Sequence, residues 1–271
     1  MASNRVFQMV NERGWRAGFS NLLRKESRDW WGTRRWLRQA IVWTLVLNGT
    51  LAAALFSPMK GADVMSLFIS RATLGLTTFF AVAGVALGIG AAILGQGEVL
   101  DEKRSGTAAW ILSKPVSRVA FILGKLVSNG IGILIIMILL QGAIAFVLVS
   151  STDASLSIGG FLAALAVPYL AVMFYFTLAF MLSAIAGGRG AAIGIPMAIL
   201  FGYQFLLGIA PWLGEIMPGG LTTPLGTSLG SVALSLAQGT AVASTMPIIA
   251  TLLWCVLFVV IAVWRFNREE F

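Results

Sequence analysis

Residues 95–125 read GQGEVLDEKRSGTAAWILSKPVSRVAFILGK and separate two long apolar stretches of the chain. Seven charged side chains stand between residues 98 and 118: Glu98, Asp101, Glu102, Lys103, Arg104, Lys114 and Arg118. At about 3 kcal/mol for each charge placed in a bilayer, burying them all would cost on the order of 20 kcal/mol. We therefore expect residues 95–118, which we call the charged loop, to lie outside the hydrocarbon and to connect two membrane spans.

Composition places the rest of the chain in a membrane. Of its 271 residues, 58% are hydrophobic and only 11% are charged, whereas soluble domains carry roughly a quarter charged residues. The net charge is +8. We attribute it to cytoplasmic loops, which collect Lys and Arg in membrane proteins, and we do not take it as a sign of nucleic-acid binding. The chain contains no histidine, which excludes His-based metal and nucleophile sites. Its one cysteine, Cys255, lies in an apolar run and is expected to be structural.

Six apolar runs approach the roughly 20 residues that a helix needs to cross a bilayer. Barrel strands are not expected, because their side chains alternate in polarity and these runs are apolar throughout. The sequence thus predicts an all-α integral membrane protein with Pro168 interrupting its fourth span, and with Pro196 and Pro211 in its fifth. The expected spans are 39–56, 72–94, 126–149, 158–186, 191–213 and 246–264.

The basic residues set the expected orientation. With the N-terminus in the cytoplasm, 17 of the 19 Lys and Arg fall in inner segments, and only Lys60 and Arg71 fall outside. Both termini are therefore expected in the cytoplasm. Residues 1–38 are predicted to form an interfacial helical segment in which Trp30, Trp31 and Trp36 lie at headgroup depth among arginines. Residues 39–264 then form the membrane domain, and 265–271 form a cytoplasmic tail.

The outer loop at 214–245 is longer than the others and carries only one charged residue, Glu215. It is too polar to span a bilayer alone and too apolar to be a free loop. We expect a re-entrant or surface-lying helix there, with its backbone shielded from lipid by protein.

The chemistry of the chain excludes several mechanisms. None of the eleven acidic residues lies in the six runs, so the usual intramembrane proton relay of a coupled carrier is missing. Sodium coordination by carbonyls and hydroxyls near Pro168 or Pro196 stays open. No nucleotide-binding P-loop and no protease or esterase motif is present. We expect no catalytic residue, no metal and no cofactor in this chain.

The charged loop also resembles a known pattern. EVLDEKRSGT, then WILSKPVSR, then the pair Gly124 and Lys125, are similar over about thirty residues to the cytoplasmic loop of ABC-2-type exporter permeases. The resemblance implies a permease subunit of an ATP-binding cassette exporter in the cytoplasmic membrane. It further implies a second permease chain, identical or different, and two copies of a separate ATPase subunit that binds ATP and Mg. No large outer domain is present, unlike permeases of the macrolide-exporter kind.

In that family the loop would form a coupling helix seated in a groove of the ATPase. The carboxylates would meet basic groups of the ATPase, while Lys103 and Arg104 would pair with acids or lipid phosphates. The implied coupling residues are Glu98, Asp101, Glu102, Lys103, Arg104, Ser105, Gly106 and Thr107.

Other functions remain open from the residues themselves. The charged loop could be an ordinary solvated loop, and the chain could be a stand-alone secondary transporter or channel, or the membrane anchor of an assembly complex. Aromatic and polar side chains in spans two and five could line a path for a lipid-like or drug-like substrate, or could simply pack the helices. These are Phe79, Phe80, Tyr203, Gln204 and Phe205.

Overall fold

The computed structural model describes residues 14–57, 70–152, 156–224 and 230–270. Lys60, residues 1–13 of the N-terminal segment, residues 225–229 of the outer loop and residue 271 of the tail lie outside the described residues. Every regular element in the described part of the chain is helical. Six helical stretches are long and apolar enough to cross a membrane, so the all-α, six-span prediction is confirmed. They are Arg35–Phe56, Arg71–Arg104, Arg118–Ser150, Ile158–Ile185, Arg189–Leu206 and Met246–Asn267.

The first three spans each contain a short π-helical segment between two α-helices. Span one is α2 (Arg35–Trp43), η2 (Thr44–Asn48) and α3 (Gly49–Phe56). Span two is α5 (Arg71–Val82), η3 (Ala83–Leu87) and α6 (Gly88–Gly95). Span three is α9 (Arg118–Gly132), η4 (Ile133–Leu139) and α10 (Leu140–Ser150). Such segments widen a helix locally and free backbone groups for other partners.

One polar contact inside the bundle uses this irregularity. The side chain of Gln141 is fully buried and donates to the carbonyl of Ile136 in η4 at 3.1 Å. Its Oε1 accepts from Asn48 at 2.9 Å and from Thr44 at 3.0 Å, both in η2. Spans one and three are therefore joined by side-chain hydrogen bonds at the level of their π-helical segments.

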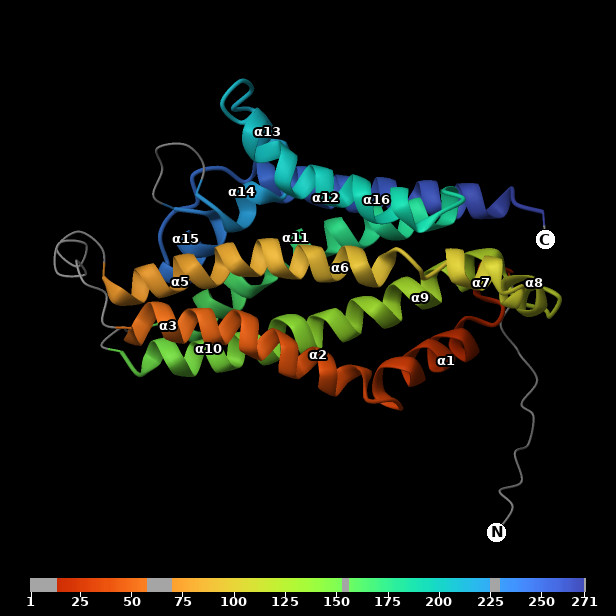
Figure 1. Ribbon diagram of the computed structural model, residues 1–271, viewed down its shortest axis with the longest axis horizontal. Coiled ribbons are helices and arrows are strands. Elements are labelled where there is room, and N and C mark those ends of the chain that lie inside the picture. The colour runs from red at the N-terminus through yellow and green to blue at the C-terminus, as the bar shows by residue number, and fades with distance from the viewer. Residues whose placement is uncertain (1–13, 58–69, 153–155, 225–229, 271) are drawn as a thin grey trace, which may run out of the picture.

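The fourth span, α11 (Ile158–Ile185), is the centre of the bundle. It packs against α6, α12 (Arg189–Leu206), α15 (Val232–Gln238) and α16 (Met246–Asn267) (Figure 1). The expected interruption at Pro168 is wrong, because α11 continues through this buried proline. In a membrane bundle neighbouring helices can compensate the hydrogen bond that a proline removes. Neither α11 nor α12, which continues through Pro196, offers a broken span for sodium.

The fifth span is shorter than expected. Helix α12 ends at Leu206, whereas the apolar run had predicted a helix to residue 213. Gly208 and Pro211 follow this end, and a proline disfavours helical conformation in the residue before it. A separate short helix, α13 (Leu213–Ile216), then turns the chain into the outer loop.

The outer loop folds back into the bundle. Helix α14 (Gly219–Thr222) packs against α11 and η3, and α15 packs against α11 and α5. A Cβ added to Gly84 would lie 2.1 Å from the Thr222 hydroxyl, so only glycine permits this contact. Gly84 stands 13 residues after Arg71 (84 − 71), or about 20 Å along a helix rising 1.5 Å per residue. The segment thus packs against the middle of span two, and its entry into the membrane stays a prediction.

The N-terminal segment forms two helices, not one. α1 (Phe19–Trp31) ends at Gly32, and α2 starts span one at Arg35. α1 lies along α9. Trp30 packs inside the protein and is 1% exposed, while Trp31 and Trp36 are exposed. The headgroup depth of these residues stays a prediction. Trp30 turns inward because Gly132 of α9 leaves room: a Cβ there would lie 2.5 Å from the indole.

Candidate functional site

The charged loop folds as two short helices joined by a sharp turn. α7 (Leu100–Arg104) ends at Ser105, and α8 (Thr107–Leu112) begins after Gly106. Gly106 has a φ of 73°, a left-handed conformation that favours glycine. Ser117 caps α9 by accepting from the Ala120 amide at 2.9 Å. The charged loop thus contains a short helix, as the resemblance implies, which ends at Ser105 and Gly106.

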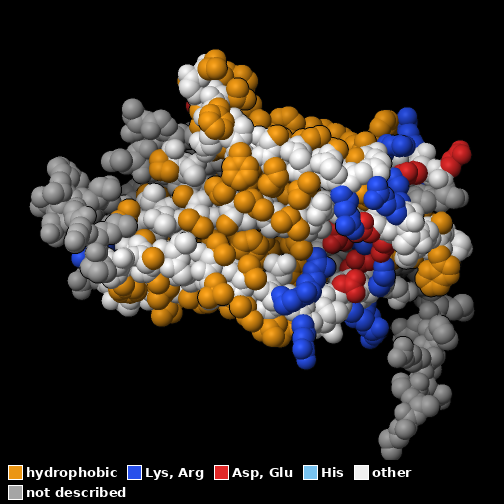
Figure 2. All heavy atoms as spheres, in the orientation of Figure 1, with side chains coloured by type: hydrophobic (Ala, Val, Ile, Leu, Met, Phe, Trp, Pro, Cys, Tyr) orange, Lys and Arg blue, Asp and Glu red, His pale blue; other side chains and the backbone are white. Residues whose placement is uncertain are grey.

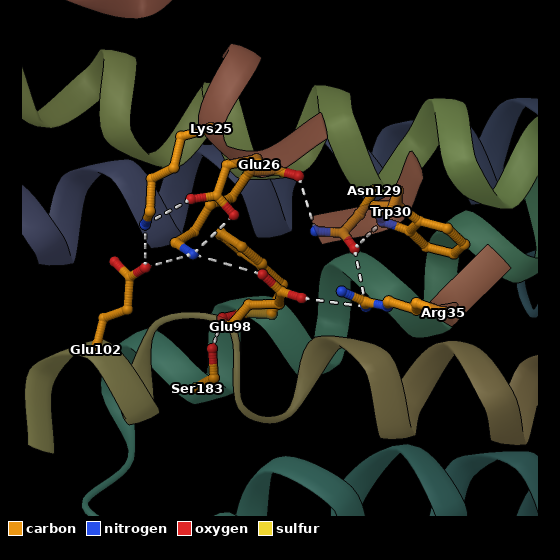
Figure 3. Close-up of polar contacts among 10 residues, drawn as sticks. Lys25, Glu26, Trp30, Arg35, Glu98, Glu102, Asn129 and Ser183 are labelled. Carbon is orange, nitrogen blue, oxygen red and sulfur yellow. Dashed lines mark hydrogen bonds and ion pairs between the residues drawn. The ribbon is translucent and has the colours of Figure 1, made fainter. Parts of the chain in front are cut away.

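A buried set of charged side chains lies behind α7, and we call it the ionic cluster. Its members come from α1, α2, the turn before α7, α7 itself and α9: Lys25, Glu26, Arg35, Glu98, Glu102 and Lys125 (Figure 3). At its centre the Lys125 Nζ lies 3.2 Å from Glu26, 3.1 Å from Glu102 and 3.6 Å from Glu98. One ammonium group thus joins three separate segments of the chain.

The charges of the ionic cluster balance, with three carboxylates and three cations. Lys125 is 4% exposed and Glu26 is 5% exposed, and a buried charge without a partner is strongly unfavourable. Lys25 bridges the outer side, 2.7 Å from Glu102 and 3.1 Å from Glu26. Partial burial lowers the pKa of Lys25, but the hydrogen bond to Glu102 and the negative charge of Glu26 outweigh it. The pKa of Lys25 is therefore raised above its ordinary value. The cluster is held together only while all three segments stay in place.

Arg35 connects the ionic cluster to the buried Trp30. Its Nη2 lies 3.6 Å from Glu98 and 3.4 Å from the Asn129 Oδ1. The same Oδ1 accepts from the Trp30 indole at 2.9 Å, and the Arg35 guanidinium stacks 4.6 Å from the indole ring. The break between α1 and α2 is therefore fixed against α9 (Figure 3).

The other charged groups of α7 bind the ends of the remaining spans. Asp101 accepts two hydrogen bonds from Arg189, at 2.6 and 3.2 Å, at the start of α12. Lys103 donates to Glu269 at 2.7 Å and to the Ala184 carbonyl at 3.1 Å. Arg104 donates to the Gly187 carbonyl at 2.6 Å. Cations suit these positions because the carbonyls at the end of α11 lack helical partners.

Residues 98–104 thus contact spans one, three, four and five, and they reach the tail after α16 through Glu269. Figure 1 shows α1, α7, α8 and the C-terminus at one end of the bundle, away from α14 and α15. Figure 2 shows the charged side chains gathered at the same end. A force on α7 would therefore reach α1, α9, α11 and α12 through ion pairs and hydrogen bonds.

Comparison with known proteins decides the family. Residues 21–271 match the family model described as ABC-2 family transporter protein. The chain belongs to the ABC-2 transporter family. No curated protein matches the sequence significantly. The chain is thus the membrane permease of an ABC transporter, a component without its own catalytic site that works with an ABC ATPase in a lipid bilayer.

The permease does not direct all its predicted coupling residues outward. Glu98 and Glu102 face the ionic cluster, with side chains 11% and 17% exposed. Asp101, Lys103 and Arg104 bind other parts of the chain. The outward surface of the charged loop is instead made by Arg104, Ser105, Gly106, Trp110, Ser113, Lys114 and Pro115. Their contact with an ATPase stays a prediction.

The residues predicted to line a substrate path do not come together. Phe79 and Phe80 are buried, and Phe80 packs 6.4 Å from the ring of Phe161. Tyr203 accepts from Gln204 at 2.8 Å beside a small cavity under α14. Phe205 is 79% exposed on the face of α12. Only Tyr203 and Gln204 share a site, and their role in transport stays a prediction.

Sequence reasoning missed Glu26, Lys125 and Asn129 as parts of the site. Lys125 had a signal, since it is a lysine within the apolar stretch that begins span three, directly after Gly124. Gly124 lets α1 approach, because a Cβ there would lie 3.2 Å from Leu22 of α1. Within the described residues no group of three or more His, Cys, Asp or Glu could hold a metal ion.

Proposed function

We propose that this permease is the membrane half of an ABC exporter of the cytoplasmic membrane, and that α7 and α8 form its contact with a separate ATPase. The observation that carries the proposal is the position of α7. Its charged side chains bind α1, α9, the end of α11, the start of α12 and the tail after α16. A segment with these connections can move several spans at once.

In this mechanism the turn between α7 and α8 receives the force from the ATPase, and the ion pairs of α7 transmit it to the spans. Glu98 and Glu102 hold α7 on Lys125, while Asp101 holds it on Arg189. ATP-driven closure of two ATPase subunits would displace the tip around Ser105 and Gly106. Because packed helices and ion pairs have discrete arrangements, a small displacement at the tip becomes a shift of whole spans.

The ATPase contact is centred on Trp110. This side chain is 62% exposed, and the Lys114 ammonium lies over its ring at 3.4 Å. An exposed tryptophan backed by a cation is typical of an interface hot spot. The carboxylates of α7 then position the contact surface from behind, while Arg104, Ser105, Gly106 and Thr107 touch the partner.

The remaining parts of the assembly follow from the family. A second permease chain would complete the path, and ATP and Mg would bind in the ATPase. The span windows of α2–α3, α12 and α16 are each less than a third buried within one chain. These faces are available to lipid or to the second permease chain. We place both termini in the cytoplasm, where α7 would meet the motor.

The test is copurification of an ATPase when the tagged chain is coexpressed with its neighbouring genes. Trp110→Ala removes the proposed anchor. Trp212→Ala is a matched control, because Trp212 is also 62% exposed but follows the end of α12 that lies away from α7. Loss of a hot spot costs about 2 kcal/mol or more, roughly 30-fold in affinity. We expect Trp110→Ala alone to lose the ATPase. Equal retention by both variants would refute the assigned surface.

A second measurement separates the permease from the alternatives. The purified chain alone in liposomes should move no solute until the ATPase and ATP are added. Transport without the ATPase would indicate a stand-alone carrier or channel. An ATPase complex that hydrolyses ATP but moves nothing in any substrate screen would favour a membrane anchor.

A further inference from the structure

A groove runs between spans one and two beside the ionic cluster and shares only Arg35 with it. It has a volume of about 420 Å³, in the range of small-molecule sites. Its walls are mainly apolar and include Val42, Trp43, Ile89 and Ile93, while Arg35 and Arg38 stand at its charged end. In Figure 2 basic side chains border the hydrophobic face of the bundle at this end.

The floor of the groove is built by one fixed side chain. Trp43 is 8% exposed and donates its indole N–H to Gln39 Oε1 at 2.6 Å. It lies directly on Gly90 of α6, where a Cβ would be 2.3 Å from the ring. Because only glycine permits this contact, the shape of the groove is set by the sequence and not by a mobile side chain.

The ionisable groups that line the groove are both basic. Arg38 is exposed and makes no ion pair with the acidic residues that the structure describes. Arg35 keeps a partly exposed side chain and a long contact of 3.6 Å to Glu98. A phosphate between the two guanidinium groups would accept hydrogen bonds from both, since Arg binds phosphate through paired hydrogen bonds. An acyl chain would cover the apolar wall.

We propose that this groove binds an anionic phospholipid of the cytoplasmic leaflet. Its phosphate would lie between Arg35 and Arg38, and an acyl chain would follow Val42, Ile89 and Ile93. The inference uses the expected membrane orientation but not the ATPase or transport, so it can fail independently of the proposed function. Since Arg35 also contacts Glu98 and Asn129, the bound lipid would stabilise the break between α1 and α2.

The test measures lipid binding to the purified, delipidated chain by native mass spectrometry. Phosphatidylglycerol should bind more tightly than phosphatidylcholine. Arg38→Gln should weaken it about fivefold, since one basic residue near a membrane surface contributes about 1 kcal/mol. Arg24→Gln is the matched control, because Arg24 is an exposed arginine of α1 that does not line the groove.

A second pair of variants tests the apolar part. Val42→Trp fills the groove, whereas Ile41→Trp adds the same side chain one residue away at a similar exposed position. Val42→Trp should abolish the preference for phosphatidylglycerol, and Ile41→Trp should keep it. Melting temperatures without lipid separate lost binding from misfolding. Equal effects within either pair, or displacement of the lipid by inorganic phosphate alone, would overturn the proposal.

Discussion

Lys125→Met should destabilise the permease strongly, because it removes the centre of the ionic cluster. The substitution keeps an unbranched side chain of similar length but leaves three carboxylates facing two cations. Breaking a buried ion pair by removing one partner costs about 3–5 kcal/mol. The cluster lines a cleft of about 360 Å³ that opens at the surface, so partial solvation favours the lower end, about 3 kcal/mol.

A double variant makes this prediction specific to charge. Glu102→Gln added to Lys125→Met restores the balance, because two carboxylates then face Lys25 and Arg35. One Glu102 oxygen, Oε2, is buried with no hydrogen-bond partner among the described residues. The Gln side chain is uncharged, so Glu102→Gln places no unpaired charge at this position. We expect the double variant to recover much of the stability lost by the single one.

The assay is thermal unfolding of the purified chain in detergent. Lys114→Met is the control, because it removes the same charge from an exposed lysine whose stacking on Trp110 contributes about 1 kcal/mol or less. Lys125→Met should melt well below this control. Equal melting temperatures for the two single variants, or a double variant less stable than Lys125→Met, would contradict this role of Lys125.

Three further predictions concern close contacts. Gly132→Val should displace Trp30 from α9, lower stability by about 1–3 kcal/mol and shift indole fluorescence toward the solvent-exposed value; an unchanged spectrum would contradict the inward position. Gly84→Val should push Thr222 and α14 out of the bundle, which limited proteolysis of the outer loop would detect as faster cleavage. Gln141→Leu should cost about 1–3 kcal/mol of unfolding free energy by leaving buried partners without hydrogen bonds, and a melting temperature equal to wild type would count against that network.

The sequence predicts the parts of this fold that depend on local physics. Long apolar runs give the six spans because each must fill a bilayer. Gly106 follows the end of α7 because glycine readily adopts the left-handed conformation found there. Ser117 begins α9 because its hydroxyl caps a free backbone N–H of the first turn. Local patterns could not show that Trp30 faces protein, since that depends on the small side chain at Gly132, on another helix.

The site was harder to predict because its chemistry is tertiary. The charges of the charged loop were visible, but their partners are distant in the sequence. Lys25 lies 77 residues before Glu102, and Arg189 lies 88 residues after Asp101. The family resemblance implied carboxylates that face the ATPase, whereas the structure pairs two of them with Lys125. The continuous helix through Pro168 likewise depends on packing in the bundle.

The central claim is that the turn between α7 and α8 meets the ATPase, and cysteine cross-linking tests it most directly. In a Cys255→Ser background, Ser105→Cys places a thiol on the exposed turn, and Thr240→Cys places one on the exposed outer loop. With an ATPase subunit that copurifies with the chain present, a bifunctional thiol–amine reagent should link only Ser105→Cys to the ATPase. No link from Ser105→Cys, or an equal link from Thr240→Cys, would contradict the account.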